Sequence, residues 1–385
     1  LILNHQGHIN MKLFILIPSL EKGGIERSMS RLSRGLLDRG WDVSIISEKP
    51  SKESISYFDE RVKLLSLGSS FINQNSNIIF SIFKNIFYYF KIKKYIKKYS
   101  PDVLLAVKNI PVSIFLKIIL KNKFKLIIRE AVNPKYSSIT QRSLLSRIFV
   151  NNLKKLLYPK ADNIIAISEG VKQSLVKNFN LDSSKIQTIY NPSADEKILS
   201  LAKEDIDRDL ISNRPLIVSI GRLTKQKDHI TLLKAFNKIH SNIDCNLYII
   251  GEGSERRNLE KFIKNNNIDN KVKLLGYQNN PWKFLSKSNL FVLPSIWEGF
   301  GNVIVESMLI GIPVISSDCP SGPREILNNG KSGKLFQVGD YNHLANIMEE
   351  IISSDNSELI NYAKLRSKDF TIEKITQEYQ KVLTH

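Results

Sequence analysis

The sequence predicts an α/β protein with two doubly wound, mostly parallel sheets, one in each half of the chain. The length of 385 residues corresponds to two or three domains at about 150 residues per domain. Short β-branched runs alternate with helical periods along the chain, which is the pattern of βαβ units. Apolar residues make up 42% and charged residues 24%, so the composition is that of an ordinary folded protein.

The first domain is expected over residues 11–195. Residues 1–10 lack the basic start and apolar stretch of a signal peptide, so we expect an N-terminal extension that contributes nothing to the fold. Helical periods cover Ile25–Leu37 and Asn77–Lys98. Strands are expected at Leu13–Ile17, Val43–Ser47, Val62–Leu65, Val103–Val107, Leu126–Arg129, Asn163–Ile167 and Gln187–Tyr190.

The second domain is expected over residues 196–370, followed by a C-terminal helix over 371–385 that can cross back to the first domain. The join should fall in Asn191–Pro215, where prolines and the charged patch Glu204–Asp209 are poor sheet-core material. Ligands of such sheets bind beyond the carboxyl ends of the strands, so two facing sheets imply one cleft. Strands are expected at Leu216–Ile220, Asn246–Ile250, Val272–Leu274, Leu290–Leu293, Val314–Ser316 and Lys334–Phe336.

Cysteine content and hydropathy indicate the compartment. The two cysteines, Cys245 and Cys319, exclude a disulfide framework and a four-thiolate zinc site and favour a reducing compartment. Apolar stretches such as Val112–Leu120 fall short of the ~20 residues that span a bilayer. We therefore expect a cytoplasmic protein without a transmembrane helix.

Positive charge is concentrated in the first half of the chain. Residues 1–200 carry 32 Lys and Arg against 15 Asp and Glu, whereas residues 201–385 carry 24 against 22. This asymmetry suggests that the first half meets a polyanion, either nucleic acid or an anionic membrane. The alternative is a lysine bias of an A/T-rich genome.

The segment from Ser295 to Glu306 has the most chemical content. Gly299 and Gly301 permit a tight turn after the strand Leu290–Leu293, and Asn302 is expected to cap a helix that runs to about residue 310. The free N–H groups of that helix start are a seat for a phosphate, and Glu298 and Glu306 could bind sugar hydroxyls on either side of a diphosphate. Alternatively, Glu306 only caps or pairs on a helix face.

The segment Gly221–Asp228 places three cations, Arg222, Lys225 and Lys227, at the carboxyl end of another strand. Fixed positive charge of this kind stabilises a diphosphate leaving group without a metal. The alternative is a solvated basic turn.

Other catalytic and cofactor motifs are absent or badly placed. The early turn with Gly23 and Gly24 lacks the Gly-x-Gly-x-x-Gly pattern, which disfavours a nicotinamide cofactor, although paired glycines still permit close approach to a ligand. No histidine lies between Met11 and Ile220, so Ser-His-Asp catalysis and histidine-rich metal sites lose support. Asp205-Ile-Asp207 sits in the charged patch and is interpreted as solvated.

Taken together, these residues resemble the retaining nucleotide-sugar glycosyltransferases of family four, of the type that builds bacterial surface polysaccharides and lipid-linked oligosaccharides. That family has the GT-B fold, in which two Rossmann-like domains face each other across a cleft. The resemblance covers essentially Met11 to Leu383. It rests on Gly23-Gly24, Ala166–Gly170, Tyr190–Pro192, Gly221-Arg222 with Lys227, Gly251–Gly253, Gly276-Tyr277, Glu298 with Glu306, and Pro320–Glu325.

The resemblance implies a role for each of these positions. Arg222 and Lys227 would bind the donor diphosphate, and Glu298 would hold the transferred sugar; these three form the catalytic set. The donor would also be bound by the residues Gly24, Gly276, Tyr277, Phe300, Gly301, Asn302 and Glu306. The family usually has a histidine where this chain reads Ile128–Pro134, and Glu130 or Asn133 is the candidate substitute on the acceptor side.

The resemblance also implies the reaction: transfer of a hexose or N-acetylhexosamine, from a UDP-linked donor, with retention of configuration and with no metal or other cofactor. A front-face displacement needs no enzymic nucleophile, because positioning and leaving-group stabilisation suffice. The implied acceptor is a membrane-associated glycan: a polyprenyl-diphosphate oligosaccharide, an O-antigen or capsule chain, or lipopolysaccharide.

A basic and aromatic helical segment is the candidate membrane contact. Its apolar residues are Ile79, Phe83, Ile86, Phe87 and Phe90, and its cations are Lys84, Lys91, Lys93, Lys94, Lys97 and Lys98. Through Lys93, Lys94, Lys97 and Lys98 it could rest on anionic headgroups, which would make the protein peripheral on the inner face of the plasma membrane. The alternative is a helix whose apolar stripe packs on the sheet while its lysines face water.

Two other classes of function stay open at this point. A nucleic-acid binder would explain the charge, but no recognition motif accompanies it, so no nucleic-acid partner is expected. A catalytically silent sugar-nucleotide binder would keep the same loops. Only turnover separates it from an enzyme.

Overall fold

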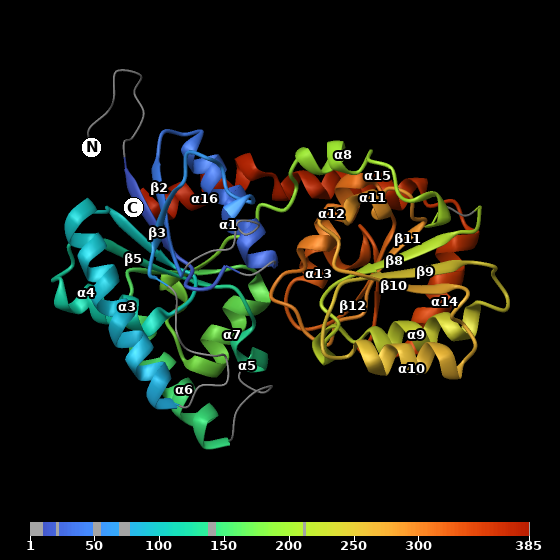
Figure 1. The fold of residues 1–385 in the computed structure, drawn as a ribbon, viewed down its shortest axis with the longest axis horizontal. Helices are drawn as coiled ribbons and strands as arrows, with labels where there is room; N and C mark the ends of the chain where they lie inside the picture. The colour runs from blue at the N-terminus through green and yellow to red at the C-terminus, as the bar shows by residue number, and fades with distance from the viewer. Residues whose placement is uncertain are drawn as a thin grey trace. The chain divides into compact units, whose positions relative to one another are not determined.

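The computed structural model describes residues 11–20, 23–48, 55–68, 78–137, 144–210 and 213–384, and the extension 1–10 lies outside them. The chain divides into two compact units, which Figure 1 shows as separate sheets with their own helices. Unit 1 comprises residues 1–192 and 372–385, and unit 2 comprises residues 193–371.

Unit 1 is built on one parallel sheet with the strand order β3-β2-β1-β4-β5-β6-β7. Its strands are β1 (Lys12–Leu16), β2 (Asp42–Ser47), β3 (Lys63–Ser66), β4 (Val103–Ala106), β5 (Lys125–Glu130), β6 (Asn163–Ala166) and β7 (Ile186–Thr188). Its described helices are α1 (Gly24–Leu37), α3 (Ile78–Tyr99), α4 (Ile110–Ile119), α5 (Pro134–Ser137), α6 (Leu144–Leu157), α7 (Glu169–Phe179) and α16 (Ile372–Thr384). The strand order reverses between β1 and β4.

The central strands of unit 1 are buried on both faces because helices cover both. β4 is buried at all four positions, and β1 is buried from Leu13 to Leu16. This is why the strands read as continuous apolar runs rather than as alternating ones.

The last helix of the chain, α16, is part of the unit 1 core. Its side chains Ile375, Tyr379 and Val382 are buried there with β1 and α1. A Cβ on Gly35 of α1 would lie 2.2 Å from Thr376 Oγ1, so only glycine lets the two helices approach this closely. The C-terminal residues therefore stabilise the unit in which the chain begins.

Unit 2 is also built on one parallel sheet, with the strand order β10-β9-β8-β11-β12-β13. Its strands are β8 (Leu216–Ile220), β9 (Asn246–Ile250), β10 (Val272–Gly276), β11 (Leu290–Leu293), β12 (Val314–Ser317) and β13 (Lys334–Phe336). Its described helices are α8 (Lys197–Leu201), α9 (His229–Ile239), α10 (Arg256–Asn265), α11 (Trp282–Leu285), α12 (Asn302–Ile310), α13 (Pro323–Ile326), α14 (Tyr341–Ser353) and α15 (Ser357–Ser367). The order reverses between β8 and β11.

The structure confirms the predicted α/β class, and each predicted strand coincides with a strand within about two residues at its ends. Two-residue differences occur at the end of β7, predicted at Gln187–Tyr190, and at the end of β10, predicted at Val272–Leu274. In the part of the chain that is described, no helix combines the length and apolar character needed to cross a membrane.

The alternative in which the predicted apolar stripe of α3 packs on the sheet is wrong. Phe83 and Phe90 are exposed, whereas the helix is buried through Tyr88, Ile92 and Ile96. The four-residue spacing of these three positions places them on one side of the helix, opposite the phenylalanines.

Candidate active site

The candidate site lies where the strand order of unit 2 reverses, between β8 and β11. The segments after these two strands carry Arg222 with Lys227 and Glu298, respectively. Parallel strands end at one edge of a sheet, and the reversal of strand order opens a crevice at that edge. The topology therefore brings together the three residues predicted to be catalytic at the usual ligand position of an open α/β sheet.

An ion pair joins the two segments. Lys227 Nζ lies 2.5 Å from Glu298 Oε1, and both side chains are largely buried. Ser295 Oγ donates a second hydrogen bond to the same carboxylate oxygen at 2.6 Å. The backbone N–H of Ile296 donates to Gln226 O at 2.8 Å, which ties the segments together beside the ion pair. The side chain of Glu298 is thus fixed in position at the reversal point.

Arg222 differs from Lys227 in having no side-chain partner among the residues that the structure describes. Its side chain is exposed, and within the described residues it makes no hydrogen bond or ion pair. The guanidinium therefore offers its donors to an incoming anion without breaking an internal contact. The basic-turn alternative applies best to Lys225, which is also exposed.

Glycines let the neighbouring loops pack directly on the segment that carries Arg222. A Cβ on Gly251 would lie 1.9 Å from Gly221 O, and one on Gly253 would lie 2.3 Å from Leu223 O. The N–H of Gly251 donates to Gly276 O at 2.8 Å, which joins the end of β10 to the end of β9. These contacts explain the Gly-x-Gly after β9 as a packing requirement.

The start of α12 corrects one prediction. Asn302 is not the N-cap: it is the first helical residue, and Gly301 occupies the cap with φ of 107°, a value that favours glycine. The Asn302 side chain instead accepts a hydrogen bond from Ser193 Oγ at 3.0 Å. A Cβ on Gly322 would lie 2.0 Å from Phe300 O. The loop after β12 therefore packs against the backbone of the segment 300–302, which is predicted to bind the donor.

Glu306 is an interior residue of α12 rather than a surface helix residue. It is 2% exposed, and Trp282 Nε1 donates to its Oε2 at 2.8 Å. Glu306 thus pairs inside unit 2, as the alternative predicted, and its role in binding the donor stays a prediction. Tyr277 follows Gly276 at the end of β10 and is exposed at the same edge of the sheet.

Two titratable groups beside the ion pair are unsuited to acid-base or nucleophilic chemistry. Burial, together with Lys227, lowers the pKa of His229 to about 3, so the imidazole is neutral near pH 7. Burial, together with Glu298, raises the pKa of Cys319 to about 12, so the thiol stays protonated. Fixed charge, rather than proton transfer by these groups, is what this edge of unit 2 supplies.

In unit 1 the predicted donor residue Gly24 opens α1 after β1, at the reversal point of that sheet. The backbone of the preceding Gly23 is extended. Lys108, in the segment after β4, donates to Ser19 Oγ at 3.2 Å, which links the segments on the two sides of the reversal.

The acceptor-side candidates both accept internal hydrogen bonds. Tyr158 Oη donates to Glu130 Oε2 at 2.6 Å, and Lys154 Nζ lies 3.5 Å from the same oxygen. Ser174 Oγ donates to Asn133 Oδ1 at 3.0 Å. Burial next to Glu130 holds the pKa of Tyr158 well above its usual range, so the phenol remains a donor to the carboxylate.

Three further residues support the candidate site or the acceptor side but were not assigned from the sequence. Ser295 and Trp282 hold the two glutamates of unit 2. Arg129, beside Glu130, is almost fully buried and donates from Nε to Tyr379 Oη at 2.9 Å. Ser295 lies three residues before Glu298 and could have been assigned on that ground, whereas Trp282 and Tyr379 reach their partners only through the tertiary fold.

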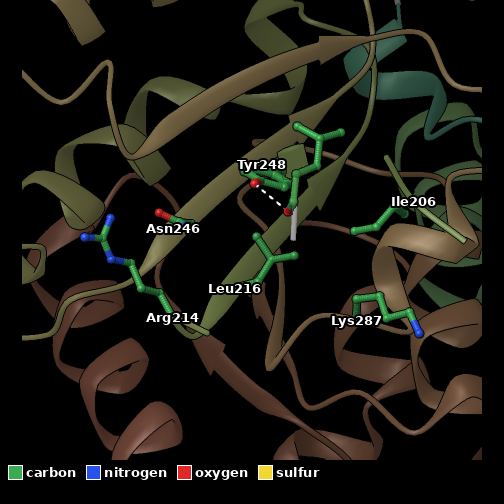
Figure 2. Close-up of a pocket in the computed structure, with 7 residues that line it drawn as sticks. Ile206, Arg214, Leu216, Asn246, Tyr248 and Lys287 are labelled. Atoms are coloured by element: carbon green, nitrogen blue, oxygen red, sulfur yellow. Dashed lines mark hydrogen bonds between the residues drawn. The ribbon is translucent and has the colours of Figure 1, made fainter. Parts of the chain in front are cut away.

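The pocket in Figure 2 is separate from the candidate site. It has a volume of about 220 Å³ and is lined by Ile206, Leu210, Arg214, Leu216, Asn246, Tyr248 and Lys287. Leu216 and Asn246 begin β8 and β9, so the pocket lies at the amino ends of the strands, at the opposite edge of the sheet. It contains none of the predicted site residues.

Among the described residues, no group of His, Cys, Asp and Glu side chains is arranged to hold a metal ion.

The four lysines predicted to contact the membrane lie on α3. Lys94, Lys97 and Lys98 are exposed on α3, and Lys93 is partly exposed with its ammonium 5.4 Å from the centroid of the Tyr89 ring.

Two family models match the chain in series. The model described as Glycosyltransferase Family 4 matches residues 22–196, and the model described as Glycosyl transferases group 1 matches residues 202–366. Each match lies almost entirely in one unit. The fold and the matches together define a two-domain glycosyltransferase.

Similar proteins cover between half and nearly all of the chain. The N-acetylgalactosamine-N,N'-diacetylbacillosaminyl-diphospho-undecaprenol 4-alpha-N-acetylgalactosaminyltransferase of Campylobacter jejuni is 33% identical over 97% of this chain and 99% of its own length. The lipopolysaccharide 1,6-galactosyltransferase of Escherichia coli is 29% identical over 51% of this chain and 54% of its own length. The structure of Anabaena HepE with UDP has a TM-score of 0.76 at 19% identity, over 97% of this chain and all of that one.

The chain therefore belongs to glycosyltransferase family 4 and has the GT-B fold of two Rossmann-like domains. The family and the fold predicted from the sequence are both confirmed.

Proposed function

We propose that this glycosyltransferase moves a hexose or N-acetylhexosamine from a UDP-linked donor to a membrane-associated glycan, with retention of configuration. The observation that carries the proposal is the buried Lys227–Glu298 ion pair at the reversal point of unit 2. Arg222, in the same segment as Lys227, makes no side-chain hydrogen bond or ion pair with the described residues. Two similar proteins support the substrate classes: the Campylobacter jejuni transferase acts on an undecaprenol-diphosphate-linked sugar, and Anabaena HepE is in complex with UDP.

In the proposed reaction the diphosphate binds Arg222 and the N–H groups at the start of α12, around Gly301 and Asn302. A helix N-terminus and a guanidinium both stabilise negative charge as it develops on the leaving group. Glu306 would accept a ribose hydroxyl, and the backbone of Gly276 with Tyr277 would contact the base. Glu298, oriented by Lys227, would accept hydrogen bonds from hydroxyls of the transferred sugar.

The chemical step follows from this placement. The acceptor hydroxyl oxygen forms a bond to the anomeric carbon on the face from which the diphosphate oxygen departs. The hydroxyl proton passes to that departing oxygen, so no enzymic nucleophile is required. Catalysis is then positioning and electrostatic stabilisation.

We propose that transfer is independent of a metal ion, because Arg222, Lys227 and a helix N-terminus supply the positive charge that the diphosphate needs. Activity should persist in excess chelator. Complete loss that Mg²⁺ or Mn²⁺ reverses would contradict this part of the proposal.

The acceptor is assigned to unit 1, with Glu130 or Asn133 on the acceptor side and Lys93, Lys94, Lys97 and Lys98 near anionic headgroups. This would make the enzyme peripheral on the cytoplasmic face of the membrane. The excess of cations in residues 1–200 supports this part of the proposal.

A catalytically silent sugar-nucleotide binder is the alternative, since such a protein would keep the same loops. The test is release of free UDP from UDP-sugars with and without a lipid-linked acceptor, followed by the anomeric configuration of the product. We expect release only with acceptor, and an α product from an α-linked donor. Binding of UDP without release would support the silent binder, and an inverted product would contradict retention.

A further inference from the structure

Unit 1 exposes an unusual set of large apolar side chains on two of its helices. These residues are between 48% and 63% exposed: Phe83, Ile86, Phe87 and Phe90 on α3, and Phe115, Ile118 and Ile119 on α4. We call them the α3–α4 apolar face. Scattered single apolar residues are normal on a surface, but a cluster of this size marks an interaction site.

The two helices lie side by side on one face of the sheet. The chain moves in the same direction across the sheet from β3 to β4 and from β4 to β5, and such parallel crossovers are right-handed. α3 and α4 therefore cover the same face and pack on each other. Figure 1 shows them together on one side of unit 1, with α1 and α16 on the other.

Neither helix needs these side chains for the core. α3 is buried through Tyr88, Ile92 and Ile96, and α4 through residues that include Val112 and Leu116. The apolar face is therefore an addition to a helix layer that already packs on its sheet. Stability of unit 1 does not account for it.

The outward side of α3 changes from apolar to cationic along its length. Phe83, Phe87 and Phe90 follow at spacings of three and four residues, and Lys94 and Lys97 continue the same side of the helix. Lys98 lies next to them and is also exposed. The ammonium of Lys91 lies 5.6 Å from the centroid of the Phe87 ring, so cations border the aromatic part as well.

We infer that the α3–α4 apolar face inserts into the interfacial layer of an anionic membrane while Lys94, Lys97 and Lys98 contact its headgroups. Aromatic and aliphatic side chains bordered by lysines are typical of helices that lie in a bilayer interface. A protein partner fits less well, because protein interfaces are depleted in lysine. The inference rests on the proposed membrane-linked acceptor, which gives the enzyme a reason to be at a bilayer.

Insertion makes a different prediction from binding by lysines alone. Attraction between lysines and headgroups is screened by salt, whereas burial of apolar surface is not. Binding to vesicles should therefore weaken at high salt but persist.

The experiment is flotation of the full-length protein with vesicles of phosphatidylglycerol and phosphatidylethanolamine, without donor or acceptor, at low salt and at about 0.5 M NaCl, where screening is strong. The apolar variant combines Phe87→Asn, Phe90→Asn, Ile118→Asn and Ile119→Asn. The charge variant combines Lys94→Gln, Lys97→Gln and Lys98→Gln. The matched control combines Tyr362→Asn and Leu365→Asn on α15 of unit 2, which are 52% and 63% exposed.

We expect the apolar variant to lose about tenfold or more in partitioning at both salt concentrations, because it removes four exposed apolar side chains that would enter the bilayer interface. At low salt the charge variant should bind vesicles more weakly than the wild type. At high salt the two proteins should bind equally, because the attraction by the lysines is screened. The control should bind like the wild type. Equal thermal shifts with UDP in all four proteins would verify that unit 2 is unaffected.

Three results would overturn the inference. Wild-type binding by the apolar variant would leave attraction by lysines as the only contact. Complete loss of wild-type binding at high salt would mean the same. A dimer that the apolar variant converts to a monomer in sedimentation, with vesicle binding unchanged, would make the face a contact between copies. A protein that inserts but transfers no sugar would keep this inference and contradict only the proposed function.

Discussion

The two units offer the same kind of residue at the same kind of place, a buried carboxylate at the carboxyl end of a parallel strand, yet they use it differently. Glu298 of unit 2 pairs with the ammonium of Lys227 at 2.5 Å. Glu130 of unit 1 accepts a hydrogen bond from the neutral phenol of Tyr158 at 2.6 Å, and the ammonium of Lys154 lies 3.5 Å from the same oxygen. One carboxylate is thus held by charge and the other mainly by a phenol.

Their positions in the sheets differ as well. Glu298 follows β11, which borders the reversal of strand order, whereas Glu130 ends β5, one strand away from the reversal between β1 and β4. Ligands of open α/β sheets bind at the reversal. A buried carboxylate at a strand end is therefore a strong candidate for ligand binding only when the topology also opens a crevice beside it.

The largest effect is expected for Glu298→Gln. The amide keeps the shape but loses the charge that orients sugar hydroxyls and pairs with Lys227, so transfer should fall more than ~100-fold, the usual cost of one transition-state electrostatic contact. Initial rates of UDP release with acceptor measure it. Glu260→Gln, on the exposed side of α10, is the control and should retain wild-type activity. A folded Glu298→Gln protein with more than a tenth of the wild-type rate would remove Glu298 from the site.

The next effect concerns how tightly the loops of unit 2 pack. Gly251→Ala would place a methyl group 1.9 Å from Gly221 O, so we expect a loss of roughly 2–4 kcal/mol in the free energy of unfolding. Gly330→Ala is the matched control, because Gly330 also has positive φ but has nothing within 4 Å of the added carbon. It should cost only about 1–2 kcal/mol of backbone strain. Equal urea midpoints for the two variants would mean that the loops separate easily.

Arg222→Gln should lower transfer about 10- to 100-fold, because one charge-assisted contact to the diphosphate is lost. The loss should appear in binding of UDP as well as in kcat/KM. Arg222→Lys should recover part of it, since the charge returns without the fork geometry. Unit 2 should remain as stable as the wild type, because Arg222 makes no internal hydrogen bond or ion pair within the described residues. Unchanged UDP affinity in Arg222→Gln would contradict the role.

The smallest effect is expected for Glu130→Gln, less than about tenfold, because the amide oxygen can still accept the Tyr158 hydrogen bond. Tyr158→Phe separates the two roles of Glu130. If Glu130 touches the acceptor, Glu130→Gln raises the KM for acceptor more than Tyr158→Phe does. Equal effects of the two substitutions would leave Glu130 as a structural residue, and a loss as large as that of Glu298→Gln would reverse the comparison.

Much of the fold could be predicted from the sequence because a strand buried on both faces is a continuous apolar run, as in Val103–Ala106. The juxtaposition of Lys227 and Glu298 could be predicted too, because both follow parallel strands and such strands end at one edge. Their roles, and those of the other candidate site residues, stay predictions.

Other features depend on the tertiary structure and could not be predicted. The sequence period of α3 contains two possible buried sides, and only packing against the sheet selects Tyr88, Ile92 and Ile96 over the phenylalanines. The cap of α12 falls on Gly301 rather than Asn302 because the turn requires a positive φ there. The contact of Trp282 with Glu306 spans 24 residues and has no local signal.

The central claim is that unit 2 binds the nucleotide sugar at the reversal of its strand order. Hydrogen exchange of the backbone amides with and without UDP tests it most directly. We predict slower exchange with UDP in 221–228, 251–253, 276–277 and 298–303, and no comparable change around Glu130 and Asn133 in unit 1. Protection at the end of β5 with none in those loops of unit 2 would show that UDP does not bind at the reversal of unit 2.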